Sequence, residues 1–133
     1  MRKITLLTTL FLTTSAAFAE RPPQSDKDAT DIVTAKVTRI YTSTEPFAGD
    51  GVMTHYIADL QIVSASKGSL KAGDQVSGRW FHVTKSPSKP LPAAYGHAYT
   101  IKPGDTVQTS LIRSRPGEYD VIYSDKGMVK AGK

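Results

Sequence analysis

The 133-residue sequence predicts an all-β domain of about six short strands, with little or no helix. Several segments alternate apolar and polar residues, which is the period of a strand with one buried face. Residues that favour turns (Gly, Pro, Asp and Ser) separate these segments. No segment of helical length shows the apolar spacing of an amphipathic helix. Together these patterns are typical of a small barrel or a sandwich.

The first strand shows the alternation most clearly, because Val33, Ala35 and Val37 occupy every second position. Ile40 falls on the opposite phase, so we expect a bulge or a twist near Thr38-Arg39. Three prolines exclude residues 84–95 from a central strand or a helix interior, and this segment is predicted to be a long loop. The predicted strands are 31–42, 52–64, 75–83, 96–101, 106–113 and 118–123, with a short closing strand at 128–129.

The N-terminal residues 1–19 have the three parts of a secretory signal peptide. A basic start is followed by an apolar stretch and by small residues before a cleavage site, which we place after Ala19. The apolar stretch is shorter than the ~20 residues that span a membrane, so we expect no membrane span in the mature chain. We therefore expect export to the periplasm or beyond. Residues 20–30 are expected to be a disordered or loosely docked leader, 31–129 a single barrel domain, and 130–133 a basic tail.

The composition excludes several classes of site. The chain has no cysteine, so disulfides, thiolate zinc sites and thiol nucleophiles are absent. A small exported domain without disulfides is more typical of a bacterial envelope than of animal secretion. The net charge of +5 includes Arg2 and Lys3 of the signal and falls to +3 without them. Because this weak basic excess is spread along the chain, we expect no nucleic-acid partner.

A short turn pattern recurs in Lys71-Ala72-Gly73-Asp74, Lys102-Pro103-Gly104-Asp105 and Arg115-Pro116-Gly117-Glu118. Each copy has a basic residue first, glycine third and an acidic residue fourth, and each precedes a predicted strand. The spacing between copies is irregular, which argues against an internal duplication. We interpret the pattern as turn chemistry, with glycine at a position that needs a positive φ.

The order of these elements resembles exported OB-fold-like barrels. The resemblance rests on the strand 33–40, on Ser66-Lys67-Gly68 at the end of an apolar strand, and on Gly73-Asp74-Gln75-Val76 at the start of the next. Tissue-inhibitor-of-metalloproteinase domains, netrin-type domains and similar bacterial exported proteins share this layout. The resemblance implies a small OB-like barrel. It implies no metalloproteinase inhibition, because those inhibitors reach zinc through an N-terminal cysteine that this chain lacks.

Two groups of residues are candidates for a site. Trp80, His82, Tyr95, Tyr99 and Arg79 place aromatic rings and a cation around the proline-rich loop, as on a strand face that binds a ligand. The alternative for Trp80 is a place in the core, where a lone tryptophan of a small domain usually packs.

The second group consists of the three histidines. His82 and His97 flank the loop, and with His55 they are the candidate ligands for copper or zinc. The alternative is that these histidines are strand-end residues with ordinary hydrogen bonds.

The sequence therefore predicts an exported, non-enzymatic binding or interaction module of the bacterial envelope. Its partner would be an envelope protein or an anionic or glycan ligand, and the sequence indicates no particular oligomeric state. The first alternative is a periplasmic copper or zinc protein that uses His82 and His97. The second is a small exported hydrolase, although no serine lies in a recognisable nucleophile motif. No catalytic residue and no cofactor other than these metals is predicted.

Overall fold

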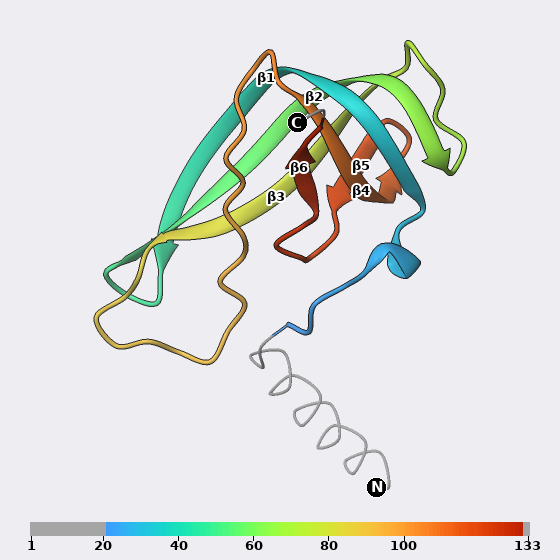
Figure 1. Cartoon of the computed structure of the whole chain (residues 1–133). Coiled ribbons are helices and arrows are strands. Elements are labelled where there is room, and N and C mark those ends of the chain that lie inside the picture. The colour runs from blue at the N-terminus through green and yellow to red at the C-terminus, as the bar shows by residue number, and fades with distance from the viewer. Residues whose placement is uncertain (1–20, 132–133) are drawn as a thin grey trace, which may run out of the picture.

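Two long strands form the most extended part of the fold in the computed structural model, which describes residues 21–131 (Figure 1). These strands are β1 (Asp31–Phe47) and β2 (Gly51–Lys67), and they pair antiparallel along their whole length. The other elements are β3 (Gln75–Lys85), β4 (Thr106–Arg115), β5 (Glu118–Val121), β6 (Met128–Lys130) and a 3-10 turn at Asp26–Asp28. The prediction of an all-β fold is confirmed.

The sheet closes on itself into a five-stranded barrel. The strand order is β1-β2-β3-β5-β4, and β1 pairs again with β4, from Asp31 opposite Leu111 to Lys36 opposite Thr106. The short β6 pairs with β4 outside this ring. All pairings are antiparallel except the one between β3 and β5. This closed order has an OB-like layout, and it decides for a barrel over the sandwich that the sequence left open.

The core fills the inside of this barrel with the alternating positions of its strands. Leu60, Leu111 and Val37 are almost completely buried. Fully burying one such aliphatic side chain contributes about 1.5–3 kcal/mol. The predicted inward face of β1, with Val33, Ala35 and Val37, is confirmed. The buried cluster is Val33, Ala35, Val37, Ala58, Leu60, Ile62, Val76, Val107, Leu111, Tyr119, Val121 and Met128.

The bulge expected near Thr38 is present in β1. Val37 lies opposite Leu60, and the next paired residue, Arg39, lies opposite Asp59. The extra residue reverses the phase of the strand. Ile40 therefore packs against the core, although it is out of phase with the earlier inward positions.

The recurring turn also has the geometry that the sequence predicts. Gly73 and Gly104 have φ values of 93° and 98°, and Gly117 shares this conformation in the third copy. The acidic residue closes each of the first two turns, because the Asp74 and Asp105 carboxylates accept the backbone N–H three residues earlier, both at 2.9 Å. The pattern therefore reflects local turn chemistry.

The predicted strands differ from the observed ones in several places. The expected strand at 96–101 is absent, and Gly96 makes only one isolated bridge, to His82. The reason is that the long connection 86–105 between β3 and β4 touches β3 only briefly before it follows another path (Figure 1). The first hairpin is also longer than expected, because the strands continue to Phe47 and resume at Gly51.

The N-terminal segment 21–30 lies against the barrel (Figure 1). Of the two states considered from the sequence, disordered or loosely docked, the structure shows a docked segment. Gln24 exchanges two hydrogen bonds of 2.8 Å with the backbone of Tyr123, and the Ser110 hydroxyl donates to Asp26 at 2.7 Å. The predicted signal peptide, 1–19, lies outside the described residues. Within residues 21–131, no helix has the length and apolarity needed to cross a membrane.

Candidate binding pocket

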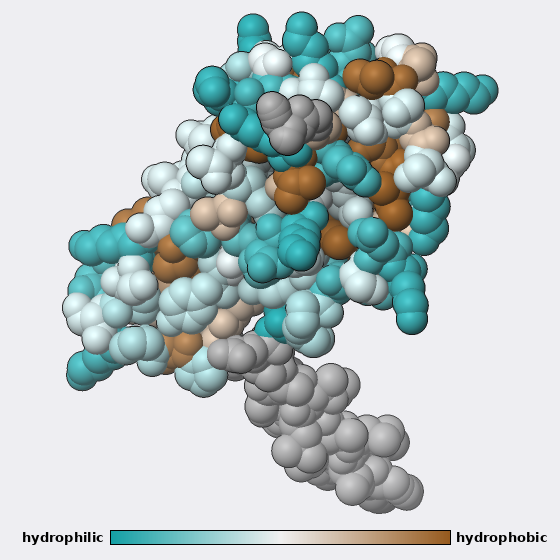
Figure 2. Space-filling view, viewed as in Figure 1, coloured by the Kyte–Doolittle hydropathy of each residue, from teal (hydrophilic) through white to brown (hydrophobic). Residues whose placement is uncertain are grey.

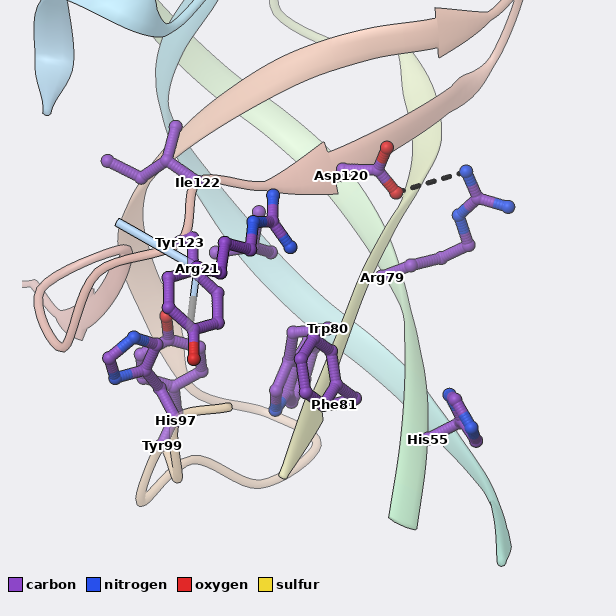
Figure 3. A pocket seen from close by; sticks show the side chains of 11 residues that line it. Arg21, His55, Arg79, Trp80, Phe81, His97, Tyr99, Asp120, Ile122 and Tyr123 are labelled. Atoms are coloured by element: carbon purple, nitrogen blue, oxygen red, sulfur yellow. Dashed lines mark ion pairs between the residues drawn. The ribbon is translucent and has the colours of Figure 1, made fainter. Parts of the chain in front are cut away.

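A pocket opens where β3 and β5 separate. The two strands pair in parallel from Ser77 opposite Glu118 to Arg79 opposite Asp120, and no further pairs follow. Side chains from β3, β5 and the segments that follow them line a cavity of about 320 Å³, near the lower end of the range for ligand sites (Figure 3). The lining residues are Arg21, His55, Arg79, Trp80, Phe81, His97, Tyr99, Asp120, Val121, Ile122 and Tyr123.

Four aromatic side chains contribute to the wall: Trp80, Phe81, Tyr99 and Tyr123. Phe81 stacks on Tyr123 with ring centroids 6.0 Å apart, and Tyr99 meets Trp80 edge-on at 5.6 Å. Such pairs contribute about 0.5–1.5 kcal/mol beyond the area that they bury. The rings therefore stabilise one another and still present apolar surface to the cavity.

Gly96 fixes the position of the loop beside this wall. Its φ is 76°, and a Cβ at this position would lie 2.1 Å from the carbonyl oxygen of Phe81. On either side of it, the Val83 amide donates to the Tyr95 carbonyl at 2.8 Å and the His97 amide to the Phe81 carbonyl at 3.0 Å. Because only glycine allows this approach, Gly96 determines where His97 stands.

The imidazole of His97 packs against the edge of the Tyr123 ring, with centroids 4.5 Å apart. Figure 3 shows His97, Tyr99 and Tyr123 gathered on one side of the pocket, and Arg79 and His55 on the other. Burial lowers the pKa of His97 below its ordinary value, and the nearby Asp125 opposes this effect. Burial therefore favours the neutral form of the ring.

Tyr99 has the opposite shift, because burial raises its pKa to about 12. Its hydroxyl donates a hydrogen bond to the Ser124 carbonyl. Tyr99 therefore contributes a neutral ring to the wall and no charge.

Two buried polar atoms at the pocket have no hydrogen-bond partner among residues 21–131. They are Arg79 Nε and His97 Nε2. The Arg79 guanidinium pairs with Asp120 through Nη2 at 3.0 Å, which leaves Nε without an acceptor (Figure 3). An unsatisfied buried polar group costs about 1–3 kcal/mol. Both such atoms in the described structure thus belong to residues of one pocket.

A second arginine comes from the N-terminal segment. The guanidinium carbon of Arg21 lies 4.6 Å from the centroid of the Tyr123 ring, which is a cation–π contact. Arg21 makes no ion pair within residues 21–131. It therefore adds a positive charge at the pocket that no described carboxylate neutralises.

The structure gathers three of the five predicted ligand-binding residues at this pocket. Arg79, Trp80 and Tyr99 line it, and Trp80 also stacks on Tyr56 at the edge of the core. Trp80 therefore packs against the core and also lines the pocket.

The other two residues lie elsewhere. His82 is on β3 beside the bridge to Gly96, outside the lining residues. Tyr95 packs edge-on against Phe47, and its hydroxyl bonds to the backbone of Leu91.

The three histidines do not form a common cluster. His55 Nε2 lies 2.7 Å from Glu45 Oε2, at the exposed rim. His82 forms the bridge to Gly96, and His97 is the next residue after Gly96. Within residues 21–131, no group of three or more His, Cys, Asp or Glu side chains is arranged to hold a metal ion.

Several lining residues have no signal in the sequence. Arg21 lies in the polar leader, and Tyr123 was expected to continue the last strand in alternation with Val121. Because β5 ends at Val121, the chain leaves the sheet and Tyr123 turns to the pocket. Phe81 also lines the pocket, where it stacks on Tyr123.

Among the described residues, the exposed large hydrophobic side chains are Tyr41, Ile57, Val63, Leu91 and Val129. On the face shown in Figure 2, hydrophobic residues form small groups among hydrophilic side chains. No family model matches the chain, and no curated protein or solved structure matches it. The fold and the site thus define a small closed β-barrel of OB-like layout with an aromatic pocket at a gap in its wall.

Proposed function

We propose that the chain is an exported, non-enzymatic binding module, and that it binds a small ring-bearing ligand in the pocket between β3 and β5. One observation carries the proposal. The two buried polar atoms that lack partners, Arg79 Nε and His97 Nε2, are at the same aromatic-lined cavity. Arg79 Nε donates, and His97 Nε2 donates or accepts according to the tautomer of the ring, so a ligand with an acceptor and a hydroxyl group would satisfy both atoms and recover the cost of leaving them unpaired.

The shape of the pocket supports a ring as the recognised group. Phe81, Tyr123, Trp80 and Tyr99 present ring faces and edges to a cavity of about 320 Å³. A planar aromatic molecule or a sugar ring can stack on such a wall with polar contacts at its edge. This agrees with the expectation of an anionic or glycan ligand.

The proposal keeps the export that the signal-like residues 1–19 predict, with the bacterial envelope as the location. The likeness to tissue-inhibitor and netrin-type domains concerns the barrel layout alone, and no inhibitory activity is proposed. The metal alternative has no supporting cluster among residues 21–131. For these reasons a binding module is the function that the geometry supports best.

The lone tryptophan provides the test. Trp80 is the only tryptophan of the chain and lines the pocket, so its fluorescence reports a ligand bound there. The protein is purified from the exported fraction, and mass spectrometry records its N-terminus, which we expect at Glu20. It is then titrated with glucose, glucuronate, benzyl alcohol and benzoate. We expect a saturable change in Trp80 emission with at least one of the four.

Phe81→Leu keeps an apolar side chain and removes a ring. We expect it to weaken binding by roughly threefold to tenfold, as the loss of one stacking contact would. The matched control is Tyr41→Leu, which removes an exposed ring on β1 and should leave binding unchanged. Absence of binding by all four ring probes would overturn the proposal. Hydrolysis of ester or glycoside substrates that depends on pocket residues would show an enzyme instead.

A further inference from the structure

We infer that the ligand carries one carboxylate on its ring, and that Arg21 of the N-terminal segment recognises this carboxylate together with Arg79. The inference rests on the proposed function and deepens it in two respects. It assigns the chemical class of the ligand, a ring acid of aromatic or sugar type. It also makes the segment 21–30, which the sequence marks only as a polar leader, a part of the binding site.

The contacts of the segment hold Arg21 at the pocket. Gln24 pairs with Tyr123 through two hydrogen bonds, from its backbone amide to the Tyr123 carbonyl and from the Tyr123 amide to its side-chain oxygen, both at 2.8 Å. Further along, the Thr30 amide donates to the Leu111 carbonyl at 2.8 Å. Ala29 is buried between these two anchors. The segment is therefore fixed on both sides of its 3-10 turn, and Arg21 is three residues from the first anchor.

Tyr123 couples the segment to the wall of the pocket. Its backbone holds Gln24, its ring carries the Arg21 guanidinium, and its hydroxyl accepts the Gly96 amide at 3.1 Å. The same residue thus joins the N-terminal segment, the loop and the pocket. A cation held against a ring in this way is oriented before a ligand arrives, which lowers the entropy cost of binding.

The charges of the lining favour a single negative charge on the ligand. Two arginines and one carboxylate, Asp120, line the cavity, and Asp120 already pairs with Arg79. The remaining positive charge is that of Arg21. A carboxylate offers two acceptor oxygens and one charge, which matches a guanidinium fork and the unpaired Arg79 Nε. A dianionic phosphate would leave one charge without a partner.

The experiment compares each acid with its neutral twin on the protein purified from the exported fraction. Benzoate is compared with benzyl alcohol, and glucuronate with glucose, by calorimetry and by Trp80 fluorescence. We expect one acid to bind about tenfold or more tightly than its twin, the effect of a charge-assisted hydrogen bond. If the benzoate pair shows this difference, the ligand is an aromatic acid; if the glucuronate pair shows it, the ligand is a sugar acid.

Arg21→Gln should remove this preference and leave the affinity for the neutral twin unchanged. The matched control is Lys27→Gln, which makes the same change of charge in the same segment, at an exposed position outside the pocket lining. Gln24→Ala removes the side-chain bond to Tyr123, and it should weaken acid binding by a few fold with Arg21 still present. Circular dichroism of each variant verifies that the barrel is intact.

The outcomes separate this inference from the proposed function. Equal binding of acid and neutral twin would overturn the inference and leave the binding module standing. An acid preference that survives Arg21→Gln would overturn the role of Arg21. If no ring probe binds the wild-type protein, the proposed function fails and the inference fails with it.

Discussion

The two sides of the barrel are built differently. On the side where β1 meets β2 and β4, long antiparallel pairings enclose Val33, Leu60 and Leu111, which are almost fully buried. On the side where β3 meets β5, only three residue pairs hold the strands in parallel before they separate. There, rings, histidines and arginines fill the gap, and two buried polar atoms lack partners among residues 21–131.

The difference separates stability from recognition within a barrel of modest size. Regular pairing and aliphatic burial stabilise the first side, and within residues 21–131 no buried side-chain nitrogen or oxygen there lacks a hydrogen-bond partner. The second side leaves two buried polar atoms without partners beside a cavity, which is unfavourable for stability and favourable for binding. We therefore expect substitutions on the first side to change mainly the free energy of unfolding, and substitutions on the second side to change the pocket as well. The predictions below run from the largest expected effect to the smallest.

The largest effect is expected on the closed side. Leu111 is completely buried in the core cluster, so Leu111→Ala should lower the free energy of unfolding by about 2–5 kcal/mol. Urea unfolding followed by circular dichroism measures this loss. Val129→Ala is the control, because that side chain is 41% exposed and should change stability by less than about 0.5 kcal/mol. Equal effects at the two positions would contradict the assignment of the core.

A smaller effect is expected where the loop meets the open side. Gly96→Ala and Gly104→Ala both place alanine at a positive φ, but only at Gly96 would the new Cβ clash with the Phe81 backbone. The strain common to both costs about 1–3 kcal/mol, and Gly96→Ala should cost more and also move His97. Unfolding measurements give the stability, and Trp80 emission reports the pocket. Identical behaviour of the two variants would show that the close approach at Gly96 has no consequence.

The smallest effect concerns acid stability. Burial lowers the pKa of His97 below its ordinary value of 6.5, so the unfolded chain binds a proton at higher pH than the folded chain does. The contribution of neutral His97 to the free energy of unfolding is complete above pH 6.5. It is lost as the pH falls through the lowered pKa of the folded state.

The variant His97→Gln should therefore flatten the fall in stability between about pH 7.5 and about pH 5.5. Urea unfolding at these two pH values, on the wild type and the variant, measures the difference. A steeper fall of the unfolding free energy in the variant would contradict the lowered pKa of His97.

The elements of the closed side could be predicted because their signals are local. The alternation of Val33, Ala35 and Val37 indicates a strand with one buried face, and the phase of Ile40 indicates the bulge. The pattern of Lys102 to Asp105 indicates a turn with glycine at a positive φ. Each of these features depends on residues a few positions apart. The prediction of a strand at 96–101 was wrong because the path of this segment depends on its contact with β3, which is distant in the sequence.

The site could be predicted only in part. Arg79, Trp80 and Tyr99 were recognised by residue type, as aromatic and basic side chains next to a proline-rich loop. Arg21 and Tyr123 were not, because the leader has no apolar pattern and the end of β5 is not marked in the sequence. These residues meet only after the N-terminal segment has crossed the barrel to pair with Tyr123.

By itself, the sequence determined the fold class, the inward faces of the strands and the chemistry of the turns. Side-chain alternation and backbone φ preferences depend on residues that are close in the sequence, so they can be recognised before the fold is known. Tertiary structure alone decided the closure of β1 on β4, the parallel pairing of β3 with β5 and the gap that follows it. Those features arise from pairing between segments far apart in the chain, which no local pattern encodes. The pocket belongs to this second group.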